Sequence, residues 1–227
     1  DAMAQSANSA LSRRRLIAGA GALGTMLAAG RGARAACGLT PRQGEGPFFP
    51  VEIPAEHDGD LTIVGNGRGR AQGGYIEISG QILNPGCQPV PGVVMEIWQA
   101  NSQGRYDHPG DAGNPRPLDP DFQGYARLAL TGDGRYRYRT VKPGSYPVFD
   151  GWVRPPHIHI KVHTPAGLAL TTQMYFPGES LNERDRLFGA LSESDRARAL
   201  VKFGSMGANG VLAGAFDITL DDGSIGA

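Results

Sequence analysis

The stretch Gly151-Trp-Val-Arg-Pro-Pro-His-Ile-His-Ile160 organises this chain. His157 and His159 alternate with isoleucines, which is the period-two pattern of a β-strand. Side chains two residues apart on a strand leave on the same face, so both imidazoles are expected to point the same way. Two imidazoles on one strand can form half of a metal site. An isolated pair of this kind is more often two histidines with a purely structural role. The neighbouring sequence is therefore needed to distinguish a metal site from a structural pair.

Further strand-like segments lie on both sides of this stretch and are separated by Gly- and Pro-rich turns. The chain holds 34 glycines and 17 prolines, a composition that favours short strands and tight turns. Gly132-Asp-Gly134 between two of the strands predicts a hairpin. The one convincing helical stretch lies within 182–202, where Ser192 suits a helix cap. We predict a mainly all-β fold, a β-sandwich with functional loops at one end and a short helical segment near the C-terminus; the expected strands are 73–83, 93–100, 125–131, 135–141, 157–160, 168–176 and 216–220.

Charge and length limit the function and the domain organisation. Basic and acidic residues number 22 each, so no net field would hold nucleic acid or an anionic membrane. We expect a removable leader at 1–36, an N-terminal extension at 37–72 and one sandwich domain at 73–227. Within the extension, the Pro- and Gly-rich stretch 40–50 has no periodicity, and we expect an ordered loop or a linker there.

The leader has the pattern of a twin-arginine export signal. Ser12-Arg-Arg-Arg-Leu-Ile17 precedes a weakly apolar run at 18–30, and small residues follow at 31–36. A membrane anchor is the alternative, but the run is shorter than the ~20 residues that span a bilayer and is rich in glycine. We expect cleavage near Ala35 or Ala36 and a periplasmic or exported product without a membrane anchor. Lipidation at Cys37 is disfavoured because Arg34 stands where such sites carry an aliphatic residue.

Cys37 and Cys87 are the two cysteines of the chain. In an oxidising compartment they could form a disulfide that ties the new N-terminus to the loop around Cys87. The other interpretation, two unpaired small side chains, stays open.

A metal on His157 and His159 needs further ligands. The remaining histidines are His57, His108 and His163, and His108 with Asp107 would suit a zinc or copper enzyme, although no spacing supports that set. Tyr106 and Tyr146 stand in tight loops bounded by Gly and Pro, where each alone is most simply a structural aromatic. Phenolate becomes a suitable ligand for a strongly acidic cation such as Fe(III), which offsets the cost of ionising a phenol.

Eight motifs, in order along the chain, resemble the intradiol ring-cleavage dioxygenases and, within that family, most closely the protocatechuate 3,4-dioxygenases. The Gly46-Pro-Phe-Phe49 segment is similar to an N-terminal motif of the family. The eight are Gln81-Ile-Leu-Asn84, Pro89-Val-Pro-Gly92, Glu96-Ile-Trp-Gln-Ala-Asn101, Gly104-Arg-Tyr106, Pro117-Leu-Asp-Pro120, Thr140-Val-Lys-Pro-Gly-Ser-Tyr-Pro147, Arg154-Pro-Pro-His-Ile-His159 and Thr172-Gln-Met-Tyr-Phe-Pro-Gly178.

The resemblance implies a mononuclear non-haem Fe(III) held by Tyr106, Tyr146, His157 and His159. Tyr146 would also help to remove a proton from the substrate. Arg154 would stabilise an electron-rich substrate, with a structural salt bridge as its alternative role, and Gln173 would line the same pocket. Tyr175 and Trp152 are expected to be packing residues.

The implied reaction inserts both atoms of O2, the co-substrate, into a small aromatic diol. A protocatechuate-like or substituted catechol would give a cis,cis-muconate-type diacid, and the family also implies a homo-oligomer. The chain shows no Gly-rich dinucleotide motif, so neither a flavin nor a nicotinamide is expected. The alternative function is a non-catalytic, transthyretin-like binding module, which would explain the strands and turns but not the four ligand positions together with Arg154.

Overall fold

The protein is described by a computed structural model that covers residues 36–65, 69–130, 132–149, 151–206 and 210–225. The expected leader therefore lies outside the described residues, apart from Ala36. In the described part of the chain, no helix has both the length and the apolar character to cross a membrane.

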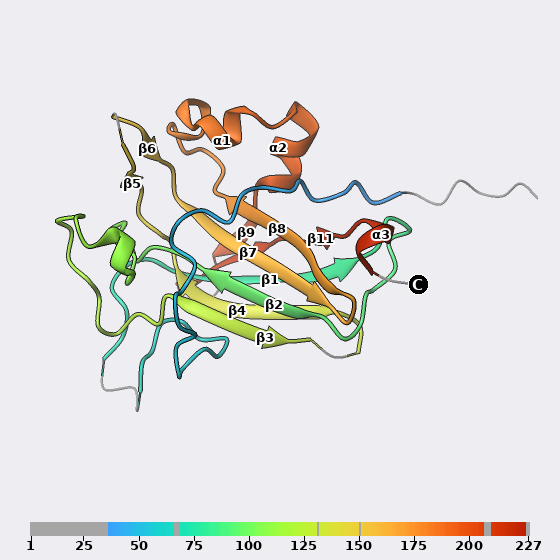
Figure 1. The fold of residues 1–227 in the computed structure, drawn as a ribbon, viewed down its shortest axis with the longest axis horizontal. Helices are drawn as coiled ribbons and strands as arrows, with labels where there is room; N and C mark the ends of the chain where they lie inside the picture. Colours follow the sequence, from blue (N-terminus) through green and yellow to red (C-terminus); the bar gives the residue numbers. More distant parts are fainter. Residues whose placement is uncertain (1–35, 66–68, 131, 150, 207–209, 226–227) are drawn as a thin grey trace, which may run out of the picture. The chain divides into compact units, whose positions relative to one another are not determined.

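Two sheets pack face to face around the main hydrophobic core, as the sequence predicts (Figure 1). In the first sheet, β1 lies between β4, which runs antiparallel to it, and the parallel strands β10 and β11. β9 extends this sheet from β10. The bounds are β1 (Tyr75–Leu83), β4 (Arg135–Val141), β9 (Lys202–Met206), β10 (Leu212–Ala215) and β11 (Ile218–Thr219).

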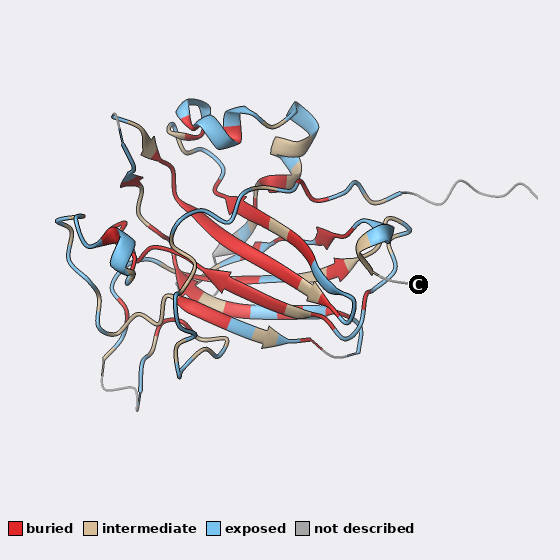
Figure 2. Ribbon diagram, in the orientation of Figure 1, coloured by how far each residue is buried: buried red, intermediate tan, exposed pale blue. Residues whose placement is uncertain are grey.

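The second sheet is antiparallel and has the order β3-β2-β7-β8. On β7, Ile158, Ile160 and Val162 point into the core, whereas the histidines alternate onto the outer face. That outer face is also covered, so β7 is buried along most of its length (Figure 2). The predicted common face for His157 and His159 is present. The strands are β2 (Val94–Trp98), β3 (Tyr125–Ala129), β7 (His157–Thr164) and β8 (Gly167–Tyr175).

The prediction of a hairpin across Gly132-Asp-Gly134 is wrong. β3 pairs with β2 in the second sheet, whereas β4 pairs with β1 in the first, so this connection passes from one sheet to the other. Gly134 has a positive φ of 68°, and a Cβ there would approach the Val90 carbonyl to 2.8 Å. The glycine is therefore needed for a close backbone approach between segments, and not for a tight hairpin.

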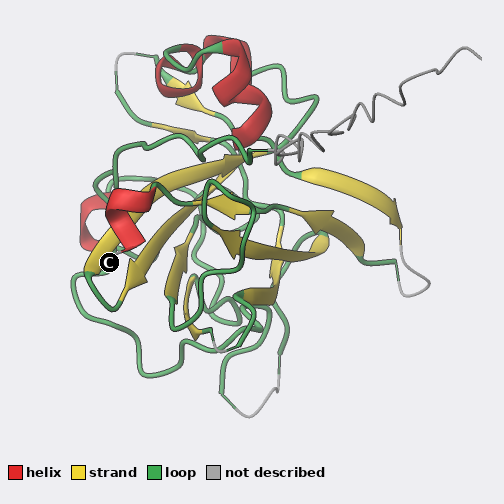
Figure 3. Ribbon diagram, turned by 90° about the vertical axis from the view of Figure 1, so that its right-hand side faces the viewer, coloured by secondary structure: helices red, strands yellow, loops and turns green. Residues whose placement is uncertain are grey.

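Short elements frame one end of the sandwich. β5 (Tyr146–Pro147) and β6 (Val153–Arg154) form a two-stranded ribbon beyond the second sheet. The helices lie around the edges of the strands (Figure 3). The predicted helix is α2 (Glu193–Ala199), whose first turn is capped by Ser192. The others are α1 (Arg186–Gly189), α3 (Asp222–Ile225) and two 3₁₀ turns at Pro109–Asp111 and Asn182–Arg184.

The described parts of the N-terminal extension, residues 37–65 and 69–72, pack on the sandwich although they contain almost no regular secondary structure. Gln43 N donates to Thr171 O at 2.9 Å, and Thr172 Oγ1 donates to Pro41 O at 2.7 Å. Cys37 and Cys87 form a disulfide, so the pairing interpretation of the two cysteines is the one observed. The contacts of Pro41 and Gln43 lay the start of the segment along β8, whereas Leu61 N donates to Arg139 O of β4 at 2.9 Å.

Candidate active site

His157 and His159 lie at the start of β7, on the outer face of the second sheet. Their Nε2 atoms are 3.1 Å apart, and both side chains are almost fully buried. His157 Nδ1 lies 2.7 Å from the Pro155 carbonyl, which can only accept, so His157 Nδ1 carries the proton and Nε2 keeps its lone pair. Burial, and then the positive charge of Arg154, lower the pKa of both imidazoles well below the usual value. Both rings are therefore neutral, the form that binds a metal.

Tyr146 and Tyr106 come to this pair from two loops that pack backbone to backbone. Gly104 has a φ of 81°, and a Cβ there would approach the Ser145 carbonyl to 2.1 Å, so only glycine allows the loops to lie so close. Tyr146 Oη lies 3.3 Å from His157 Nε2, and the two tyrosine rings are 5.2 Å apart in an edge-to-face arrangement. The structure thus brings together all four residues that the family resemblance implies as metal ligands.

The donor set fits a ferric ion. Tyr106 is 3% exposed and its Oη makes no hydrogen bond among the described residues. Burial, and then the nearby Tyr146, raise the pKa of Tyr106 well above its usual value. An unpaired buried hydroxyl is costly unless a ligand satisfies it. The described residues contain no group of three or more His, Cys, Asp or Glu side chains placed to hold a metal, so the zinc or copper set with His108 and Asp107 is not formed.

Arg154 lies opposite Tyr146 in the β5–β6 ribbon and is 4% exposed. Its guanidinium donates to both carboxylate oxygens of Asp185, at 3.1 and 3.0 Å, and to Gln173 Oε1 at 2.8 Å. Burial opposes the charged form, but the hydrogen bonds to Asp185 keep the pKa of Arg154 above its usual value. The salt bridge considered for Arg154 is present, and it places a fixed positive charge beside the two histidines.

Asp185 is a residue of this network that sequence reasoning missed. Its side chain is completely buried, and it also accepts from Trp152 Nε1 at 3.1 Å and from the backbone N–H of Phe188. Tyr175 Oη accepts from Arg154 and donates to Gln173, so Tyr175 and Trp152 are hydrogen-bonding members of the site as well as packing residues. Nothing in the local sequence distinguishes Asp185 from the other acidic residues of the helical region, and only the fold brings it to Arg154.

Tyr106, Tyr146, His157 and His159 together are called the four-residue centre. The N-terminal segment at residues 44–50 covers this centre. Gln173 Nε2 donates to the Gly44 carbonyl at 2.9 Å, and the Phe48 ring stacks on Tyr106 with centroids 4.5 Å apart. Lys161 pairs with Glu45, and its Nζ lies 3.4 Å from the centre of the Phe49 ring. These contacts exclude water from one side of the centre.

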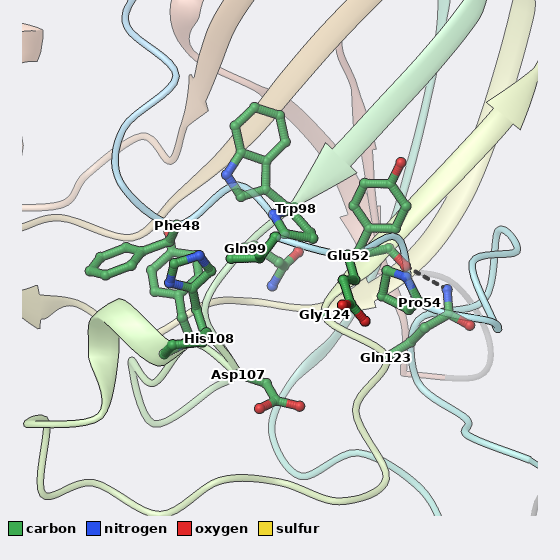
Figure 4. Close-up of a pocket in the computed structure, with 14 residues that line it drawn as sticks. Phe48, Glu52, Pro54, Trp98, Gln99, Asp107, His108, Gln123 and Gly124 are labelled. Carbon is green, nitrogen blue, oxygen red and sulfur yellow. Dashed lines mark hydrogen bonds between the residues drawn. The ribbon is translucent and has the colours of Figure 1, made fainter.

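A cavity of about 390 Å³ borders the centre at Tyr106 and Trp98 (Figure 4). The Trp98 ring lies parallel to His159, with centroids 4.8 Å apart, so it separates the cavity from that histidine. A volume of this size is sufficient for a small aromatic ligand.

Comparisons with known proteins show the family of this chain. A family model described as "Dioxygenase" matches residues 44–222. The protocatechuate 3,4-dioxygenase beta chain of Burkholderia cepacia is 39% identical over 161 residues, which are 69% of this chain and 68% of that protein. Catechol 1,2-dioxygenase 1 of Acinetobacter lwoffii is 32% identical over 157 residues, and the match spans 63% of this chain but 48% of that relative.

Solved structures show the same fold. The dioxygenase domain of a carbohydrate-binding fusion protein from Streptomyces sp. SirexAA-E matches with a TM-score of 0.60 and 31% identity, over 81% of this chain and 99% of that chain. An intradiol ring-cleavage dioxygenase from Tetranychus urticae has a TM-score of 0.64 at 22% identity, over 82% of this chain and 95% of that one, which supports the fold alone. By the family match and the identity to its relatives, this chain belongs to the intradiol ring-cleavage dioxygenases.

Proposed function

We propose that this chain is a ferric intradiol dioxygenase that uses Tyr106, Tyr146, His157 and His159 to hold one iron and cleaves a catechol with O2. The observation that carries the proposal is the convergence of two neutral imidazole nitrogens and two buried phenols at one point of the sheet. When bound, ferric iron would supply Lewis-acid chemistry and would favour the ionised phenols.

Tyr146 is assigned the proton transfer. Burial raises the pKa of Tyr146, whereas the charge of Arg154 acts in the opposite direction and favours the phenolate. Burial has the larger effect, so Tyr146 Oη keeps its proton in the site as described, and its phenolate would accept a proton from an incoming catechol hydroxyl. His157 keeps its orientation through the Pro155 carbonyl during this step.

Arg154 and Gln173 are assigned to the substrate. Asp185 fixes the guanidinium in the buried site, where its charge would stabilise the ionised ring oxygens of a catechol. Gln173 supports Arg154 and holds the N-terminal segment at the same time.

The substrate is a small aromatic diol, protocatechuate-like or otherwise substituted, and the product is a cis,cis-muconate-type diacid. The names of the relatives, which include enzymes of protocatechuate, catechol and hydroxyquinol, support an ortho-diol as the shared feature. One relative is named as a beta chain and another as an alpha chain, which supports assembly, and we propose a homo-oligomer. Light scattering of the purified chain alone would measure its mass.

The test is an anaerobic visible spectrum together with the iron content. We expect a coloured protein with about one iron per chain and a tyrosinate-to-iron band that shifts when a catechol is added. Oxygen should then yield the diacid. A protein that stays colourless after loading with Fe(III), and whose spectrum does not respond to catechols, would overturn the proposal and leave the non-catalytic binding module.

We also propose that the chain is exported through a twin-arginine signal to the periplasm or beyond. The arginines at 13–15 and the disulfide between Cys37 and Cys87 support this, because disulfides persist in oxidising compartments. Replacing Arg13 and Arg14 by Lys should leave the protein in the cytoplasmic fraction, and unchanged export would contradict the proposal.

A further inference from the structure

We propose that the cavity beside Tyr106 receives the ring substituent of the catechol and selects uncharged substituents over a carboxylate. This inference rests on the proposed function and names the substrate class more narrowly.

The position of the cavity places it next to the reacting centre. Tyr106 belongs both to the four-residue centre and to the cavity wall, and Trp98 stands between the cavity and His159. A catechol held at Tyr106 would have this volume beside it for a group on its ring.

The wall of the cavity is aromatic and apolar over much of its area. Such a surface packs against a ring and its neutral substituents without requiring charge. The aromatic and proline side chains of the wall are Phe48, Pro50, Pro54, Trp98, Tyr106, Pro109 and Tyr125.

The charged residues of the wall are acidic. Glu52 and Asp107 both line the cavity, and no Lys or Arg is among the residues that line it in the described part of the chain. Two buried cations of the site already have partners, because Lys161 pairs with Glu45 and Arg154 with Asp185. A substituent carboxylate would find no Lys or Arg partner in this wall, whose carboxylates carry the same charge, and this disfavours its binding.

The experiment compares protocatechuate with 3,4-dihydroxybenzamide, which has nearly the same size but no charge. Each dissociation constant is measured anaerobically with the iron-loaded protein, from the shift of the visible band, at about pH 8. The comparison is repeated with the double variant Glu52→Gln/Asp107→Asn and with the control Glu183→Gln, which removes an exposed carboxylate elsewhere.

We expect the wild type and the control to bind the amide about fivefold more tightly than protocatechuate, the size of effect that exposed like charges can produce. The double variant should reduce this ratio, and added salt should reduce it in the wild type. Equal or tighter binding of protocatechuate by the wild type, or a ratio that the double variant leaves unchanged, would overturn the inference. Absence of any band shift with either ligand would instead be a failure of the proposed function.

Discussion

At the scale of single residues, burial and the charge of Arg154 shift the pKa of Tyr146 in opposite directions. Its hydroxyl lies 3.3 Å from His157 Nε2 and faces the charge of Arg154. Tyr146→Phe keeps the ring and removes only the oxygen. We expect turnover to fall at least about 100-fold, the usual contribution of a proton-transfer group, and the visible band to change. Tyr138→Phe is the control, because the Tyr138 hydroxyl is buried in the main core and has no hydrogen-bond partner among the described residues, and turnover of this variant should be unchanged.

A substitution of Asp185 can show whether turnover depends on the orientation of the Arg154 guanidinium as well as on its presence. Asp185→Asn leaves a buried guanidinium without a full countercharge, so we expect a loss of about 3 kcal/mol in the free energy of unfolding. Iron content should stay near that of the wild type, because Asp185 touches none of the four proposed ligands, while turnover falls. Chemical denaturation, iron analysis and kinetics separate these effects, and normal turnover in the folded variant would show that the salt bridge is structural only.

At the scale of elements, the N-terminal segment at residues 44–50 packs against the start of β7. Gly46 has a φ of 76°, and a Cβ there would lie 3.2 Å from His159 Cε1. Gly46→Ala should therefore cost about 1 kcal/mol in backbone strain and push the segment away from the histidine, which weakens iron retention against a chelator. Gly44→Ala is the control, because a Cβ there meets nothing within 4 Å. Equal iron loss in both variants would mean that the segment does not support the centre.

The strands could be predicted individually, but their partners could not. The alternation of apolar and polar residues located β1, β4 and β8, because that signal lies within a few consecutive residues. The pairing of β4 with β1 joins residues more than 50 positions apart, and the glycine turn before β4 looks locally like a hairpin. β9 and β10 were missed because their short segments contain several Gly and Ala residues and show little alternation.

At the scale of the whole molecule, the disulfide between Cys37 and Cys87 closes a loop with a sequence separation of 50. Closing a loop of that length removes unfolded-state entropy worth about 4 kcal/mol. Replacing both cysteines by serine should lower the thermal midpoint in oxidising buffer, and dithiothreitol should lower that of the wild type but not of the variant. Identical midpoints for the four samples would show that the bridge does not stabilise the fold.

More of the candidate site than of the strand pairing around it could be predicted from the sequence. Tyr106, Tyr146, His157 and His159 lie in motifs whose order along the chain carries information, and the geometry places them together. The roles of Asp185 and of the cavity residues Glu52 and Asp107 depend on contacts between distant segments, which no local pattern encodes.

The disulfide also has a consequence for the integrity of the site after backbone cleavage. Cys37 and Cys87 enclose the whole N-terminal segment that covers the centre, including Gly46 and Phe48. A protease that cuts once between the two cysteines would divide the polypeptide, yet both fragments would remain one covalent molecule and the Phe48 fragment would stay next to Tyr106. The nicked protein should run as a single species on a gel without reductant and as two species with it, and reduction would let the smaller fragment diffuse away from the site.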